Sequence, residues 1–123
     1  MATIDLTKDN FEQIINDNDF ILVDFWAPWC APCRQFKPVF EKVAENHPDV
    51  VFCKVNTEAE RELAGYFQIR SIPTLMIFRE KVIVYSEAGA MSESDLEKLV
   101  GQVKQLDMEQ IHKDIAEQEA ANS

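Results

Sequence analysis

The chain has 123 residues, 46% of them apolar, which is enough for one domain built around a single core. Its formal net charge is −10, from 22 acidic and 12 basic residues, and such a surface repels phosphate backbones, which argues against a nucleic-acid partner. No apolar run is long enough to cross a bilayer, and the first residues lack the basic and apolar segments of an export signal.

The first third of the chain predicts a strand, a helix and a second strand. A weak strand over residues 2–6 precedes a helix for which Asp9 and Glu12 form a candidate capping box. The polar cluster 16–19 ends that helix. The run 20–27 is almost continuously apolar, as expected for a central strand that is covered on both faces.

The middle of the chain continues this alternation. A helix is predicted from residue 30 to about residue 46, and Pro38 inside it should produce a kink. Residues 50–55 form a second buried strand. Thr57 and Glu60 then form another candidate capping box, which opens a third helix.

The last third predicts a hairpin and a helix. After a connector at residues 71–74, two strands over 75–78 and 82–85 are separated by only three residues, which is too short for a crossover helix. These strands must therefore be antiparallel, although the loop lacks the Gly or Asn that would identify its turn type. Ser92 with Asp95 opens the final helix of an α/β sandwich with a mixed sheet.

A thin apolar stripe continues beyond that helix, formed by Met108, Ile111 and Ile115 among acidic residues. We interpret it as an overlong, fraying and solvated helix end, with a partner-binding helix as the alternative. The predicted organisation is thus a domain over residues 1–106 and an acidic C-terminal extension over residues 107–123.

Two cysteines stand where the central strand gives way to a helix, in the sequence Trp-Ala-Pro-Trp-Cys-Ala-Pro-Cys over residues 26–33. A helix N-terminus stabilises a thiolate, which is the attacking species in thiol–disulfide exchange. Pro32 loses no helical hydrogen bond in the first turn. We therefore predict redox chemistry, with Cys30 as the nucleophile and Cys33 as the more buried, resolving thiol.

Asp24 is the only charged residue in the run 20–27. An ionised carboxylate in that setting is costly, so burial should raise its pKa and make it a proton acceptor near neutral pH. We predict that it accepts the proton of Cys33. The alternative is a structural aspartate that is satisfied by backbone donors or by Lys54, itself an isolated charge in an apolar strand.

The stretch 26–33 resembles the active-site signature of the thioredoxin family, in which Cys-Gly-Pro-Cys is usual. The similarity covers about residues 3–106, and further features recur in the family's order. They are Val23-Asp24-Phe25, Pro38, Lys54, Ser71-Ile72-Pro73-Thr74 and Ala88-Gly89-Ala90.

This resemblance implies a thioredoxin-like three-layer sandwich, with a five-stranded mixed sheet flanked by four helices and a cis peptide bond before Pro73. It implies Asp24 as the proton acceptor, with Lys54 and Trp26 in supporting positions. It also implies a docking surface for partner proteins, formed by Trp29, Ala31, Pro32, Ile72, Pro73, Gly89 and Ala90.

The activity that the resemblance implies is that of a protein-disulfide reductase without a bound cofactor. Its electrons would come from NADPH through a flavin-containing thioredoxin reductase, and its substrates would be disulfide-containing client proteins. Ala31 departs from the family pattern, because Gly is usual there. The added methyl group should alter the reduction potential or the range of clients.

The remaining candidate ligands argue against a metal site. Only one Cys-x-x-Cys pair is present, whereas structural zinc usually takes two spaced pairs. Cys53 is predicted to be a small buried hydrophobic residue, and His47 and His112 to be solvated.

Two other functions stay open at this stage. One is a binding or chaperone module of the same fold, and the other is a disulfide isomerase or oxidase. Three cysteines, an odd number, do not suit a structural disulfide framework, so we expect a reducing, cytoplasmic setting, which favours a reductase.

Overall fold

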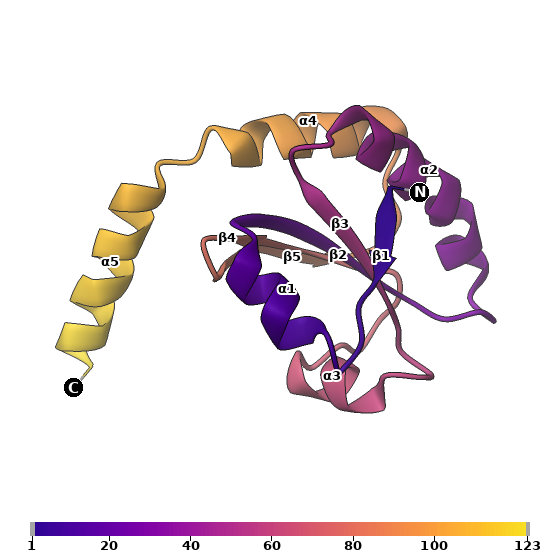
Figure 1. The fold of residues 1–123 in the computed structure, drawn as a ribbon, viewed down its shortest axis with the longest axis horizontal. Coiled ribbons are helices and arrows are strands. Elements are labelled where there is room, and N and C mark those ends of the chain that lie inside the picture. The colour runs from indigo at the N-terminus through magenta and orange to yellow at the C-terminus, as the bar shows by residue number, and fades with distance from the viewer. Residues whose placement is uncertain (1, 123) are drawn as a thin grey trace.

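The computed structural model describes residues 2–122. Met1, in the predicted domain 1–106, and Ser123, in the predicted extension 107–123, lie outside the described residues. The strands are β1 (Thr3–Asp5), β2 (Phe20–Trp26), β3 (Val51–Asn56), β4 (Thr74–Arg79) and β5 (Val82–Ala88). The helices are α1 (Phe11–Asp17), α2 (Ala31–Asn46), α3 (Arg61–Tyr66), α4 (Glu93–Lys104) and α5 (Met108–Ala121). Figure 1 labels these elements.

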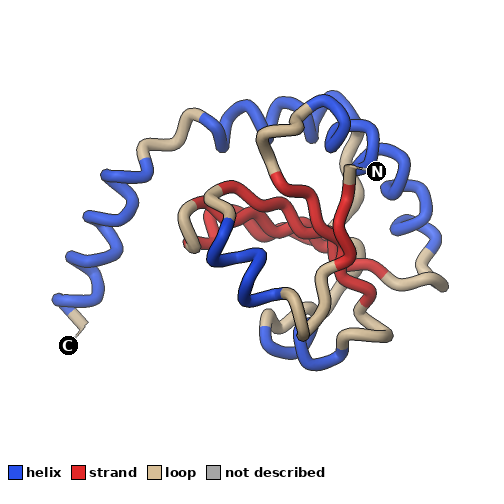
Figure 2. The backbone as a smooth tube through the Cα atoms, viewed as in Figure 1, coloured by secondary structure: helices blue, strands red, loops and turns tan. Residues whose placement is uncertain are grey.

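The five strands form one mixed sheet in the order β1-β3-β2-β4-β5 (Figure 2). The strands β1, β3 and β2 run parallel, whereas β4 is antiparallel to both β2 and β5. Strand β2 takes the middle position, as its apolar sequence predicts, because a strand covered on both faces needs apolar side chains on both. The expected five-stranded α/β sandwich is therefore confirmed.

The helices cover the two faces of the sheet in pairs. One core, packed against α2 and α4, contains Leu22, Phe36, Phe40, Val43, Phe52, Ile77, Leu96 and Val100. The core on the opposite face, packed against α1 and α3, contains Ile21, Val23, Phe25, Cys53, Val55, Leu63, Met76 and Phe78. Burial of each large apolar side chain contributes about 1.5–3 kcal/mol, which holds both helix layers against the sheet.

The helix starts differ from two of the three predicted capping boxes. The N-cap residue of α1 is Asn10, and no side-chain hydrogen bond caps this helix. Instead, the Asn10 side chain accepts a hydrogen bond from the backbone N–H of Thr7, at 2.7 Å, in the turn that precedes the helix. The predicted capping box of Asp9 and Glu12 is therefore wrong, because the helix begins one residue later, after Asn10, and the Asn10 side chain bonds to the preceding turn.

The box of Thr57 and Glu60 is also wrong, because α3 begins only after Glu60. The Thr57 hydroxyl donates to the backbone oxygen of Trp26, at 3.0 Å, and so ties this loop to the end of β2. Ser92, in contrast, caps α4 as predicted, since its hydroxyl accepts from the N–H of Asp95 at 3.1 Å.

The hairpin between β4 and β5 is closed by a two-residue turn. Its residues, Glu80 and Lys81, have positive φ angles of 49° and 69°. Positive φ at both central positions is the pattern of the turn that best matches strand twist, and Asn or Gly usually occupies it. The turn type was not predictable from the sequence, because two charged residues occupy the positions where Asn or Gly is usual.

The C-terminal segment forms a helix of its own. The chain leaves α4 after Lys104, and the Asp107 side chain caps α5 by accepting from the N–H of Gln110 at 3.0 Å. The expected continuation of one overlong helix is therefore corrected to two helices, which run in different directions in Figure 1. Met108 is buried, and His112 lies 3.0 Å from Glu80 in the β4–β5 turn.

No helix among residues 2–122 combines the length and the apolar character needed to span a membrane.

Candidate active site

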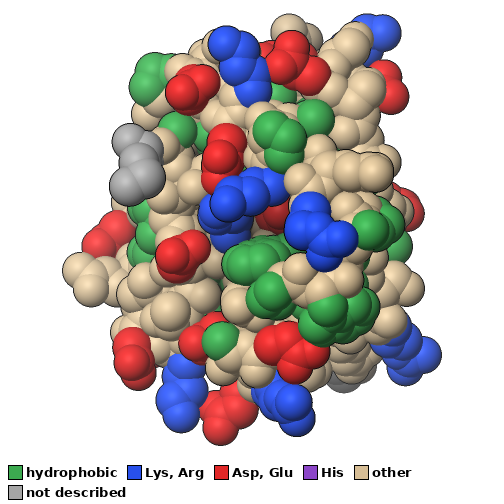
Figure 3. Space-filling view, turned by 90° about the vertical axis from the view of Figure 1, so that its right-hand side faces the viewer, with side chains coloured by type: hydrophobic (Ala, Val, Ile, Leu, Met, Phe, Trp, Pro, Cys, Tyr) green, Lys and Arg blue, Asp and Glu red, His purple; other side chains and the backbone are tan. Residues whose placement is uncertain are grey.

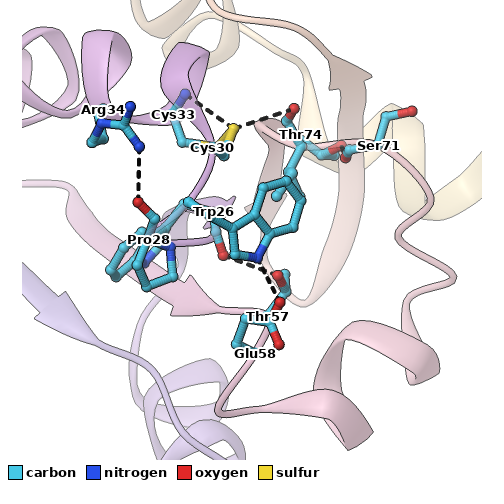
Figure 4. Close-up of a disulfide and its surroundings, with 11 residues drawn as sticks. Trp26, Pro28, Cys30, Cys33, Arg34, Thr57, Glu58, Ser71 and Thr74 are labelled. Atoms are coloured by element: carbon cyan, nitrogen blue, oxygen red, sulfur yellow. Dashed lines mark hydrogen bonds between the residues drawn. A yellow bond between two sulfur atoms is a disulfide. The ribbon is translucent and has the colours of Figure 1, made fainter.

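Cys30 and Cys33 form a disulfide at the start of α2. Cys30 is the N-cap residue, and its Sγ accepts a hydrogen bond from the backbone N–H of Cys33 at 3.2 Å (Figure 4). This N–H and the positive end of the helix dipole stabilise negative charge on the Cys30 sulfur after reduction. Both cysteines are largely buried, with 5% of Cys30 and 2% of Cys33 exposed, so the predicted difference in burial is small.

The loop before β4 approaches the disulfide from the other side. The peptide bond between Ile72 and Pro73 is cis, as predicted. The carbonyl oxygen of Ile72 lies 3.8 Å from the Cys30 Sγ, and the carbonyl oxygen of Pro73 accepts from the N–H of Gly89 at 2.7 Å. Gly89 has a φ of 111°, a conformation that favours glycine. The fold thus brings Ile72 against the Cys30 sulfur, and Gly89 is bonded to the next residue of the same loop.

Two tryptophans flank the cysteines in different environments. Trp26 is half-buried and packs against the cluster of Ala27, Cys30 and Cys33. Trp29 is 66% exposed, and its indole N–H donates to a carboxylate oxygen of Glu58. Trp26 therefore belongs to the packing around the disulfide, whereas Trp29 is presented to solvent.

Most of the predicted docking residues are exposed around the cysteines. Trp29, Ala31, Pro32, Gly89 and Ala90 are exposed, whereas Ile72 is half-buried and Pro73 is buried. Pro73 has no N–H, and its carbonyl oxygen accepts from Gly89, so this surface consists mainly of the exposed side chains around the cysteines.

Asp24 is only 1% exposed, although it is a carboxylate. Burial raises its pKa from 3.8 to about 7, and the positive charge of Lys54 opposes this rise. Its Oδ1 atom has no hydrogen-bond partner in the structure. The alternative of a structural aspartate satisfied by backbone donors or by Lys54 thus finds no hydrogen bond to Oδ1 among the described residues, and a pKa near 7 makes this carboxylate change protonation state near neutral pH.

A cavity of about 510 Å³ connects Asp24 with the resolving cysteine. Its lining comes from β1, β2, the β2–α2 loop, α2 and β3, and consists of Asp5, Asp24, Trp26, Pro28, Cys33, Arg34, Lys37 and Lys54. The indole N–H of Trp26 is also without a partner there. Two unpaired polar atoms among the described residues thus belong to side chains that line one cavity together with Cys33.

Three charged residues on α2 also belong to this region, although their sequence context did not single them out. Arg34 and Lys37 line the cavity, and Arg34 donates to the carbonyl oxygen of Pro28 at 3.0 Å (Figure 4). Glu41 forms an ion pair with Lys54 at 3.1 Å. The spacing of four residues from Cys33 to Lys37 and on to Glu41 places them on one side of a helix, and this signal could have identified them.

Figure 3 shows the side of the molecule where α2 and the loop before it lie, and Lys and Arg side chains gather there beside hydrophobic ones. A protein with a net charge of −10 thus has cationic groups concentrated around the cavity next to its cysteines.

The third cysteine and the two histidines lie outside the site. Cys53 is fully buried and free, and burial raises its pKa to about 12, which confirms an inert thiol. The side chain of His47 is only 15% exposed and contacts Glu97, so the prediction that it is solvated is wrong. His112 is more exposed, at 45%. No group of three potential metal ligands exists among the described residues.

The chain is similar in sequence to known proteins of one family. Residues 2–102 match the family model named Thioredoxin. A protein named "Putative thioredoxin 2" from Streptomyces coelicolor is 56% identical over 119 residues, which span 97% of this chain and 89% of that protein. Thioredoxin C-3 from Corynebacterium nephridii is 39% identical over 83% of this chain and 71% of that protein.

Among solved structures, a mutant thioredoxin from Halobacterium salinarum superimposes with a TM-score of 0.78 at 30% identity. The superposition covers 85% of this chain and 92% of that one. The range matched by the family model, residues 2–102, includes all five strands and the helix α2 that begins at the cysteine pair.

Proposed function

The chain belongs to the thioredoxin family and is a thiol–disulfide oxidoreductase that reduces protein disulfides, and we propose that its electrons come from NADPH through a flavin-containing thioredoxin reductase. The observation that carries the proposal is the Cys30–Cys33 disulfide at the N-terminus of α2, beside a cavity that holds Asp24. The reductase returns this disulfide to the dithiol after each turnover.

In the first step, the Cys30 thiolate attacks one sulfur of the client disulfide. A bond forms between Cys30 and that sulfur, the client S–S bond breaks, and the second client sulfur leaves as a thiolate that takes up a proton. The N–H of Cys33, 3.2 Å from the Cys30 Sγ, supports the assignment of Cys30 as the nucleophile.

In the second step, Cys33 gives its proton to Asp24 and attacks the Cys30 sulfur. The mixed disulfide breaks, the client leaves fully reduced, and the Cys30–Cys33 disulfide forms. Support for Asp24 as the acceptor comes from its position in the same cavity and from its pKa of about 7, which matches a base that works near neutral pH.

Clients dock on the surface formed by Trp29, Ala31, Pro32, Ile72, Pro73, Gly89 and Ala90. Support comes from the exposure of Trp29 and from the carbonyl oxygen of Ile72, which lies beside the nucleophile. An extended client segment next to the cis-proline loop then places its disulfide against Cys30.

We place this reaction in the cytoplasm. The odd number of cysteines and the inert Cys53 suit a compartment that keeps thiols reduced.

The reduction potential of the Cys30–Cys33 pair tests the direction of the reaction. We expect equilibration with glutathione buffers, followed by alkylation and mass measurement, to give a value below the cytosolic glutathione potential of roughly −220 to −260 mV. NADPH oxidation by a thioredoxin reductase should then require both this protein and a client disulfide. A potential well above the glutathione range would indicate an oxidase or isomerase instead.

A further inference from the structure

Lys54 lies among three carboxylates. Its Cα is paired with Asp5 on β1 and with Asp24 on β2, so the three side chains lie on the same face of the parallel part of the sheet. Helix α2 covers this face and contributes the third carboxylate, Glu41. The side chain of Lys54 is only 14% exposed, so the choice of partner matters more than it does at the surface.

The ammonium group of Lys54 pairs with Glu41 and leaves Asp24 unpaired. The Lys54 Nζ lies 3.1 Å from the Glu41 Oε2, whereas the Asp24 Oδ1 has no hydrogen-bond partner within residues 2–122. Lys54 and Asp24 nevertheless line the same cavity. Because Asp24 and Lys54 are paired on neighbouring strands, Asp24 is a second carboxylate beside the lysine, whose ammonium group contacts Glu41 instead.

We propose that Glu41 is a positioning residue for proton transfer from Cys33, because it holds the Lys54 ammonium away from Asp24 and so keeps Asp24 a stronger base. The proposal rests on the role of Asp24 proposed above. Among the described residues, Glu41 contacts Lys54, so Glu41 acts through that lysine and not on the cysteines directly.

Removal of the Glu41 charge frees the ammonium group to approach Asp24. An opposite charge favours the ionised carboxylate and lowers its pKa. The other charged groups around the cavity are Asp5, Arg34 and Lys37, which are exposed and therefore screened by solvent. Lys54 is thus the charge that most affects Asp24, and Glu41 fixes its location.

The test is a titration of Asp24 in the oxidised protein, in which Cys30 and Cys33 do not titrate. We expect Glu41→Gln to lower the pKa of Asp24 from about 7 to about 6. Carbon NMR of the Asp24 carboxyl group measures this pKa. Glu45→Gln is the matched control, because Glu45 lies one turn further along α2 and is exposed. It removes the same charge and should leave the pKa of Asp24 unchanged.

A second pair of variants shows whether Glu41 acts through Lys54. In a Lys54→Gln background, Glu41→Gln should no longer lower the pKa of Asp24, because no ammonium group remains to be released. An equal effect in both backgrounds would indicate direct repulsion between the two carboxylates and would overturn the proposal.

The pH profile of client reduction separates this proposal from the role of Asp24 itself. We expect the acid limb of the rate profile to move to lower pH in Glu41→Gln by as much as the pKa of Asp24 moves. An unchanged pKa of Asp24 would overturn the role of Glu41. A lowered pKa with an unchanged profile would instead refute Asp24 as the proton acceptor, and with it any catalytic part for Glu41.

Discussion

Asp24 is a buried carboxylate whose ionisation opposes folding. Its folded-state pKa of about 7 lies above the ordinary value of 3.8, so the folded protein binds this proton more tightly than the unfolded chain does. The cost is absent below pH 4, grows as the pH rises from about 4 to about 7, and is constant above that. The protein thus retains at its site a group that weakens the fold at working pH.

Replacement of Asp24 by Asn should therefore stabilise the protein at pH 8 by up to about 4 kcal/mol, at about 1.4 kcal/mol for each pKa unit, and by almost nothing at pH 4. Urea unfolding of the oxidised form at both pH values measures the difference. Asn cannot accept the proton of Cys33, so we also expect slower client reduction without the inflection near pH 7. An equal stability gain at both pH values would show that burial does not shift the pKa.

At the scale of single residues, the sequence was sufficient for the groups that lie close together along the chain. The spacing of Cys30 and Cys33 at a strand–helix junction, and the isolated charge of Asp24, pointed to the site without any tertiary information. The pairing of Lys54 with Glu41 was not predictable in this way. It depends on how α2 lies across the sheet, which packing between distant segments determines.

At the scale of elements, helix starts depend on which polar side chain the preceding turn leaves free. Ser92 is free to accept from the N–H of Asp95, so it caps α4. Thr57 matched the same pattern, but its hydroxyl donates instead to the backbone oxygen of Trp26, at the end of the neighbouring strand. A local pattern is thus reliable only where no long-range partner competes for the same side chain.

We expect Ser92→Ala to lower the free energy of unfolding by about 1 kcal/mol, because it removes the side-chain acceptor at the start of α4. Asp9→Ala serves as the comparison. Asp9 matched the capping pattern in sequence, but no side-chain hydrogen bond caps α1, so its loss should change stability by less than about 0.5 kcal/mol. Urea denaturation measures both, and equal losses would contradict the assignment of these caps.

At the scale of the whole molecule, α5 is the feature that extends beyond the sandwich. Figure 1 shows it on the side away from the start of α2. The match to the Streptomyces coelicolor relative spans 97% of this chain and therefore includes most of this helix. The division of the chain into a domain and an extension at residue 106 stays a prediction. The burial of Met108 argues against it, because a separate extension would leave this side chain exposed.

Removal of residues 107–123 should lower the free energy of unfolding by about 1.5–3 kcal/mol, the contribution of one buried Met side chain, and leave the rate of client reduction unchanged. Met108→Ala in the full chain should account for most of that loss. Thermal unfolding and a disulfide-reduction assay measure the two effects. A drop in turnover after truncation would show that α5 takes part in client binding.

The contact of Trp26 with Cys30 and Cys33 has an optical consequence for the molecule. A disulfide quenches the fluorescence of an indole packed against it, and a dithiol does so much less. Trp29, exposed and bonded to Glu58, contributes emission from a more polar environment. We therefore expect the emission intensity of the protein to rise when the cysteine pair is reduced, so that fluorescence follows the redox state without an added label.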